Sequence, residues 1–238
     1  MLRFITCSIC LLIGLGNVTA QELEVLLDYE VTYVVPNGKK NTIDTISIQL
    51  DKKGHFLFME SNSMGLNLAR GVFPDPNTDL SGSECSFLLD TQRMLVYFSF
   101  HLNDTKMFLQ MDVTQFIPIN NPMGDDMATL NLLTEKRGDQ IQLGGALYDS
   151  YLLYPETEPD QPIILAIDEK RPVDNAALIN RVIELMLQKS KSNVPVNLDI
   201  PNGLIMAIGF QEESLMKAID ARDVNTKINI QHSFNITE

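Results

Sequence analysis

The side chains best suited to acid–base or metal chemistry are few in this sequence and lie far apart. The only histidines are His55, His101 and His232, each in or beside a segment with the pattern of a β-strand. A zinc site usually combines three or four Cys, His or carboxylate ligands, two of them close in sequence, and a catalytic nucleophile needs an adjacent base. The sequence has no such spacing and no Gly-x-Ser-x-Gly, phosphate-loop or His-Glu-x-x-His motif. We therefore expect no catalytic residue and no cofactor, and a hydrolase site would have to be assembled from distant positions.

One loop carries oxygen-bearing side chains at the spacing of a calcium site. Asp75, Asn77, Asp79 and Ser81 occupy alternate positions, as the ligands of a calcium-binding loop do. The pattern then departs from such a loop, because Leu80 stands where the sharp turn requires glycine and a serine stands where the bidentate glutamate belongs. A polar turn, in which Asx side chains bond to their own backbone, explains the same residues. The sequence favours that turn, so we predict no metal site and keep the loop as the calcium candidate.

Residues 1–20 have the composition of a signal peptide. A positive charge at Arg3 precedes an apolar run over residues 4–15, and small residues end the segment at Ala20. The run is shorter than the roughly 20 residues that a transmembrane helix requires. We therefore expect cleavage after Ala20 and export of residues 21–238 to the periplasm or the extracellular space, without a transmembrane span.

Cys85 is the only cysteine outside the predicted signal peptide, so no disulfide is expected within the exported chain. Its surroundings, Cys85-Ser86-Phe87, are typical of a buried strand. The adjacent Glu84 disfavours a thiolate, and we predict a buried apolar residue rather than a reactive thiol.

The charge of the chain excludes one class of partner. The formal net charge is −13, and no run of Lys or Arg interrupts it. An acidic surface of this size repels phosphate backbones and anionic lipid head groups. We therefore expect no binding to nucleic acid.

Alternation of apolar and polar residues is the commonest local pattern. Over residues 25–35, Val, Leu and Tyr occupy every second position, which predicts a long strand with one buried face. Turns at 36–38 and 51–54 lead into strands predicted at 46–50 and 55–60, so the three form an antiparallel meander. Further strands are predicted at 86–89, 93–101, 106–113, 129–135, 140–143, 146–154, 162–168, 202–210 and 227–234.

One segment has helical spacing instead. Asp174 is the predicted N-cap of a helix that extends to about residue 190 and carries a wide apolar stripe from Ala177 to Leu187. Such a stripe has to be covered, and the apolar face of the sheet is the available surface. We also predict a short helix at 212–220, a connector at 195–201 and a long loop at 72–83.

The middle of the chain resembles a known group of proteins. The motif Leu143-Gly144-Gly145 within residues 136–145, the following strand that ends in Tyr151-Leu152-Leu153-Tyr154, and the acidic pair Asp168-Glu169 before the helix carry this resemblance. It is to uncharacterised exported proteins of Gram-negative bacteria that are similar to the periplasmic lipoprotein-carrier half-barrel. Ala146 and Leu147 depart from the pattern, since Cys or Tyr often follows the glycine step there. The resemblance implies a curved antiparallel sheet that holds a helix and, in the carriers, an acyl chain; it implies no catalytic residue.

Together these patterns predict a single α+β domain over residues 21–238. Its curved, half-barrel-like antiparallel sheet would carry the helix at about 174–190 on the concave face. The eleven methionines and eleven phenylalanines suit either an ordinary core or an adaptable binding surface. We expect a non-enzymatic envelope protein that binds a lipid or lipopeptide between sheet and helix. The alternative is a module with a filled core that binds another envelope protein, and the third hypothesis is a hydrolase.

Overall fold

The computed structural model describes most of the chain beyond the predicted signal peptide. The described residues are 23–37, 42–60, 75, 79–80, 83–102, 105–112, 129–189, 196–210, 213–230 and 234–237. The predicted signal peptide, residues 1–20, and most of the predicted loop at 72–83 lie outside them.

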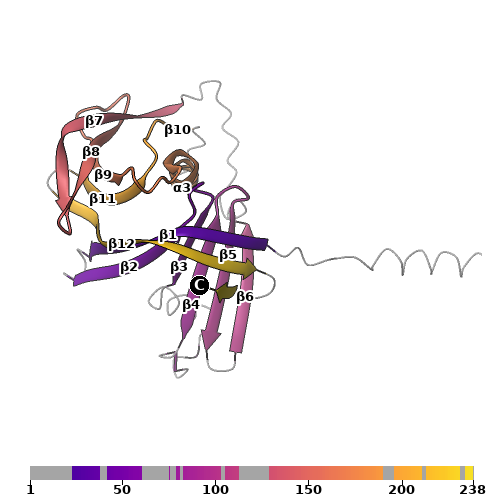
Figure 1. The fold of residues 1–238 in the computed structure, drawn as a ribbon. Coiled ribbons are helices and arrows are strands. Elements are labelled where there is room, and N and C mark those ends of the chain that lie inside the picture. The colour runs from indigo at the N-terminus through magenta and orange to yellow at the C-terminus, as the bar shows by residue number, and fades with distance from the viewer. Residues whose placement is uncertain are drawn as a thin grey trace, which may run out of the picture.

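One sheet contains all the described strands, and a single described helix, α3 (Asn175–Lys189), packs against it (Figure 1). The expected predominance of antiparallel sheet with a helix near residues 174–190 is therefore confirmed. The sheet is open, with the order β10-β7-β8-β9-β11-β12-β1-β2-β3-β4-β5-β6 and with β13 beside β12. Only the pairing of β10 with β7 is parallel among the described strands. The strands are β1 (Leu23–Asn37), β2 (Thr42–Leu50), β3 (Phe56–Glu60), β4 (Glu84–Asp90), β5 (Leu95–Leu102), β6 (Thr105–Asp112), β7 (Leu130–Leu143), β8 (Ala146–Pro155), β9 (Ile163–Asp168), β10 (Val196–Leu198), β11 (Leu204–Phe210), β12 (Glu213–Ile230) and β13 (Phe234–Thr237).

Two long strands, β1 and β12, form the spine of the sheet. Their antiparallel ladder has irregularities between Leu27 and Tyr29 and between Thr32 and Tyr33. Such bulges bend a strand and increase its twist. Strands β3 to β6 run across the direction of β1 and β12 (Figure 1). We call β3 to β6 the meander region, and β7 to β11 together with α3 the helix region.

One row of side chains across the strands shows how burial changes from β1 to the meander region. Glu30 lies opposite Gln49, Gln49 opposite Phe58, and Phe58 opposite Leu88, so these side chains share one face of the sheet. Glu30 and Gln49 are partly exposed, whereas Phe58 and Leu88 are buried in a cluster with Leu27 of β1. A face that is polar beside β1 thus becomes apolar in the meander region, where the N-terminal part of β1 covers it.

The helix is held by two apolar clusters. Ala176, Ile179 and Ile183 lie on one side of α3 and pack against a cluster from β7, β8, β9 and β10, together with Ile200 just after β10. Leu178 packs into a second cluster that includes residues of β1, β2, β11 and β12. The first three residues follow the i, i+3, i+7 spacing of one helix face, so this segment buries an apolar stripe. Leu178 and Ile183 belong to the predicted stripe, whereas the side chains of Val182 and of residues 185–187 lie outside the described ones. No helix in the described part of the chain is long and apolar enough to cross a membrane.

The short helix predicted at 212–220 is wrong, because residues 213–220 belong to β12 and Glu212 lies outside the described residues. Its register with β11 skips from Met216 to Ser214, and its register with β1 skips from Asp220 to Ala218. Leu215 and Ile219 are therefore the extra residues of two bulges and stay 44% and 57% exposed. Each extra residue interrupts the alternation of a strand, and the apolar residues Leu215, Met216 and Ile219 therefore have the spacing of a helix face.

Three smaller predictions also need correction. The predicted connector at 195–201 contains β10, which pairs with β7. The strands predicted at 129–135 and 140–143 form one strand, β7, whose register shifts between Lys136 and Gln140. The predicted closing strand at 227–234 is instead the end of β12 followed by β13, which folds back onto it.

Candidate ligand-binding site

The start of α3 is fixed by hydrogen bonds from its first residues. The Oδ1 atom of Asp174 accepts the backbone N–H of Ala177 at 3.0 Å, so the predicted N-cap is confirmed. The backbone N–H of Asp174 donates to the carbonyl of Lys52, also at 3.0 Å. Asn175 is buried, and its Nδ2 donates to the carbonyls of Pro201 and Gly203, each at 2.8 Å. The helix start is therefore tied to two loops that are distant in sequence.

The turn between β2 and β3 contacts the helix start closely. Gly54 has a φ of 65°, and a Cβ atom there would lie 2.2 Å from the carbonyl oxygen of Asp174. The carboxylate of Asp51 holds this turn by accepting the backbone N–H groups of Phe56 at 2.7 Å and Lys53 at 3.2 Å. Only glycine fits at position 54, so the turn requires both its conformation and its missing side chain.

An apolar pocket of about 120 Å³ lies beneath the first turn of α3. Its walls come from β1, β2, β3, β11, β12 and the helix. Val173 and Leu204 in the lining are fully buried, whereas Ile48, Leu57 and Met216 are partly exposed. The partly exposed side chains place the pocket's edge at the surface. The lining residues are Tyr33, Ile48, Leu50, Leu57, Val173, Asn175, Leu178, Gly203, Leu204, Ile205 and Met216.

The few polar groups of the pocket are already engaged. The hydroxyl of Tyr33 donates to the carbonyl of Ile205 at 2.6 Å, and burial raises the pKa of this phenol. Both amide hydrogen bonds of Asn175 go to backbone carbonyls. No charged side chain lines the pocket. Because an unpaired charge is costly to bury, the pocket selects an uncharged apolar group and offers no group for acid–base chemistry.

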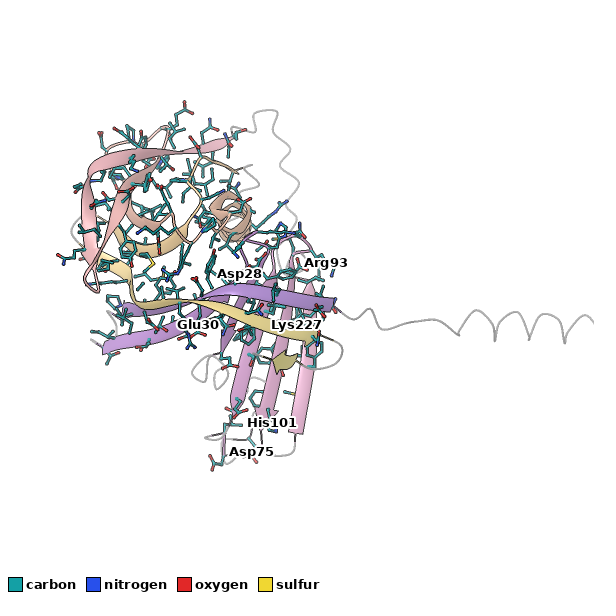
Figure 2. The ribbon with its side chains drawn as sticks, in the orientation of Figure 1. Asp28, Glu30, Asp75, Arg93, His101 and Lys227 are labelled. Atoms are coloured by element: carbon teal, nitrogen blue, oxygen red, sulfur yellow. The ribbon has the colours of Figure 1, made fainter. Side chains whose placement is uncertain are left out.

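The structure does not bring the described histidines together. His55 precedes β3 and lies 3.1 Å from the amide nitrogen of Gln92 through Nε2. His101 lies on β5, with Nδ1 3.6 Å from the carboxylate of Glu84. These contacts are at opposite ends of β4, about 20 Å apart for a strand of this length. Figure 2 shows His101 at the end of the meander remote from β1. His232 lies outside the described residues.

The candidate calcium loop is only partly described. Asp75 and Asp79 are exposed, and Figure 2 shows Asp75 near the same end of the meander as His101. Asn77 and Ser81 lie outside the described residues. Within the described part of the chain no group of three His, Cys, Asp or Glu side chains could hold a metal ion.

Cys85 is buried, as predicted, in an aromatic cluster of the meander region. Its neighbours in that cluster include Phe87, Phe98 and Phe100. Burial, rather than the neighbouring glutamate, raises the pKa of the thiol to about 12. The thiol therefore stays protonated at neutral pH and is not a nucleophile.

A charged network joins β7, β8 and the end of β9, within the segment that suggested the family resemblance. The Nζ atom of Lys136 lies 2.7 Å from the carboxylate of Asp149 and 3.7 Å from that of Glu169. The hydroxyl of Tyr151 donates to Glu169. The hydrogen bond to Asp149 is the main cause that raises the pKa of Lys136. An ammonium held in this way is a structural contact and not a nucleophile.

The sequence alone predicted no ligand-binding residue, because the residues that line the pocket follow the same pattern as core residues. Tyr33 and Ile48 line it, yet they alternate along their strands like any other core residues. Methionine content gave one hint, since Met216 lies at the pocket's edge while Met206 is buried in the core. No protein-family model matches the chain, and no curated protein matches it.

Proposed function

We propose that this chain is an exported, non-enzymatic protein that binds a hydrophobic ligand, a lipid or a lipopeptide, by inserting one apolar end beneath α3. In this proposal the sheet acts as a half-barrel, and α3 lies on its concave face. The observation that supports it is the pocket between helix and sheet, which has apolar walls and no charged lining. Export is supported by the composition of residues 1–20.

The size of the pocket limits what can enter. Its volume of about 120 Å³ is a little below that of an engineered apolar cavity of roughly 150 Å³ that binds benzene. The pocket therefore suits the tip of one hydrocarbon chain or a single ring. Each methylene that leaves water for the pocket contributes about 0.8 kcal/mol. The remainder of a long ligand would lie outside, along the partly exposed Ile48, Leu57 and Met216.

The test compares two substitutions on the same strand. Ile48→Phe fills the pocket from its partly exposed edge, whereas Ile43→Phe makes the same change at a side chain that is 70% exposed and not part of the lining. We expect the unmodified protein and Ile43→Phe to bind a fluorescent fatty acid, and Ile48→Phe to bind it much more weakly. Native mass spectrometry of the purified protein should show a bound apolar molecule that Ile48→Phe lacks. Equal binding by the two variants, or no binding by the unmodified protein, would refute the proposal.

The alternative function, a module that binds another envelope protein, is favoured by a different observation. The bulges of β12 leave Leu215 and Ile219 exposed, and Ile43 is exposed on β2. Exposed apolar side chains are common at protein interfaces. This function predicts that fatty-acid binding is missing in all three proteins of the test above.

A further inference from the structure

A second cavity lies on the other side of the sheet from α3, where β1, β2, β3 and β12 meet. Its volume is about 340 Å³, within the range of small-molecule sites. Glu30 and Gln49 line it, whereas their neighbours along the strands, Val31 and Ile48, belong to the apolar cluster beneath the helix. Successive strand residues point to opposite faces, so the two cavities are separated by the sheet.

The charges in this cavity are not balanced. The Oε1 atom of Glu30 lies 2.9 Å from Nη2 of Arg222, and its Oε2 accepts Nε2 of Gln49 at 2.9 Å. The side chain of Glu30 is only 16% exposed, so this carboxylate is fully engaged and paired. Glu60 is the second carboxylate of the lining, and no ion pair joins it to another described residue. The walls therefore carry one uncompensated negative charge.

The walls also carry hydrogen-bond acceptors besides Glu30. The amide nitrogen of Gln49 is committed to Glu30, and its Oε1 atom is buried without a hydrogen-bond partner in the described part of the protein. The Thr226 hydroxyl and the Glu60 carboxylate add further acceptors to the lining. Phe58 supplies an apolar part of the wall. A ligand that complements this cavity brings positive charge, N–H donors and a short apolar portion.

We propose that this cavity binds a small alkylammonium ion, with the ammonium beside Glu60 and the carbon chain toward Phe58. The acidity of the whole chain, with a net charge of −13, raises the local concentration of such cations. An anion would meet an excess of carboxylate, and a neutral polyol would leave the charge of Glu60 uncompensated. The proposal is independent of the hydrophobic ligand, because the two cavities share no lining residue.

The test uses three probes of similar size on the full exported chain. n-Butylammonium has one positive charge, N–H donors and an apolar chain, tetramethylammonium has the charge without the donors, and 1-butanol has the chain without the charge. Isothermal titration calorimetry at low salt should show saturable binding of n-butylammonium alone. Added salt should weaken this binding, because screening reduces the attraction between partly exposed charges.

Two variants distinguish the cavity from general attraction to an acidic protein. Glu60→Gln removes the uncompensated charge, and Glu158→Gln removes the same charge from the exposed turn between β8 and β9. We expect Glu60→Gln to weaken n-butylammonium binding about fivefold and Glu158→Gln to leave it unchanged. Both side chains are exposed, so both variants should fold, and equal melting temperatures would verify this.

The results of these measurements distinguish the cation-binding proposal from the hydrophobic-ligand proposal. Ile48→Phe, which fills the apolar pocket on the other face, should bind n-butylammonium like the unmodified protein, so failure of the hydrophobic-ligand proposal leaves this one standing. Three results would overturn it: no saturable binding of n-butylammonium, equal binding of tetramethylammonium, or equal weakening by Glu60→Gln and Glu158→Gln.

Discussion

The helix region and the meander region bury their sheets in different ways. In the helix region the one described helix packs on the sheet, and the apolar pocket lies beneath its first turn. In the meander region side chains from both faces are buried, one face against β1 and β12 and the other in an aromatic cluster. The rings of Phe87 and Phe98 are 5.1 Å apart there, and those of Phe98 and Phe100 are 6.5 Å apart.

The comparison assigns different roles to the two regions. Close-packed aromatic rings contribute stability through burial and through ring contacts, whereas a pocket represents burial that was left incomplete. The spine strands β1 and β12 belong to both, because the N-terminal part of β1 closes the meander core and its C-terminal part lines the pocket. We therefore interpret the aromatic core of the meander region as the support, and the junction of α3 with β1, β2, β3, β11 and β12 as the part that binds the hydrophobic ligand.

The largest loss of stability should come from removing a buried aromatic ring of the meander region. Phe100 is 1% exposed, and Phe100→Ala should lower the free energy of unfolding by about 3–5 kcal/mol. Leu109→Ala, at a side chain that is 43% exposed on the neighbouring strand, should have a much smaller effect. Urea denaturation measures both. At temperatures where Phe100→Ala is still folded, its fatty-acid binding should equal that of the unmodified protein; weaker binding would show that the pocket depends directly on the meander core.

The second largest loss of stability should come from the turn between β2 and β3, which contacts the start of α3. Gly54→Ala places a methyl group against the carbonyl of Asp174 and forces alanine to a positive φ, whereas Gly144→Ala imposes a positive φ of 56° with nothing within 4 Å. We expect Gly144→Ala to cost about 1 kcal/mol, and Gly54→Ala to cost about 2–3 kcal/mol. The difference isolates the contact with the helix start.

Fatty-acid binding is a second property in which the Gly54→Ala and Gly144→Ala variants should differ. Displacing the turn at Gly54 moves Leu50 and Leu57, which line the pocket on either side of it. Gly54→Ala should therefore weaken fatty-acid binding, while Gly144→Ala at the β7–β8 turn should not. If both variants bound equally well, the turn would not control the shape of the pocket.

Much of the fold was predictable because alternation and capping are local. The residues at 25–35 and the cap at Asp174 needed no tertiary information. The sequence could not reveal the bulges at Leu215 and Ile219, because a bulge is a relation between two strands and the partner strand lies far away in the chain. The two cavities were hidden for a similar reason, since Glu30, Gln49 and Arg222 meet only through strand register.

The smallest expected effect is a pH dependence at the turn between the regions. Asp51 is 5% exposed, and its burial raises the pKa of the carboxyl although backbone hydrogen bonds favour the charged form. An acid with a raised pKa binds its proton more tightly in the folded state than in the unfolded state. Its contribution therefore increases stability as pH falls through the folded pKa, and becomes constant below the unfolded pKa of about 3.9.

Asp51→Asn tests this contribution, because asparagine keeps an oxygen that can accept the N–H of Phe56 but does not titrate. The difference in unfolding free energy between the unmodified protein and Asp51→Asn should shift in favour of the unmodified protein as pH falls from about 7 to about 4. Asp160→Asn, at an exposed turn residue, serves as the matched control and should show no such shift. A difference that shifts in the opposite direction would mean that the backbone hydrogen bonds of the turn outweigh burial, and that the turn grips the start of α3 most firmly when Asp51 is charged.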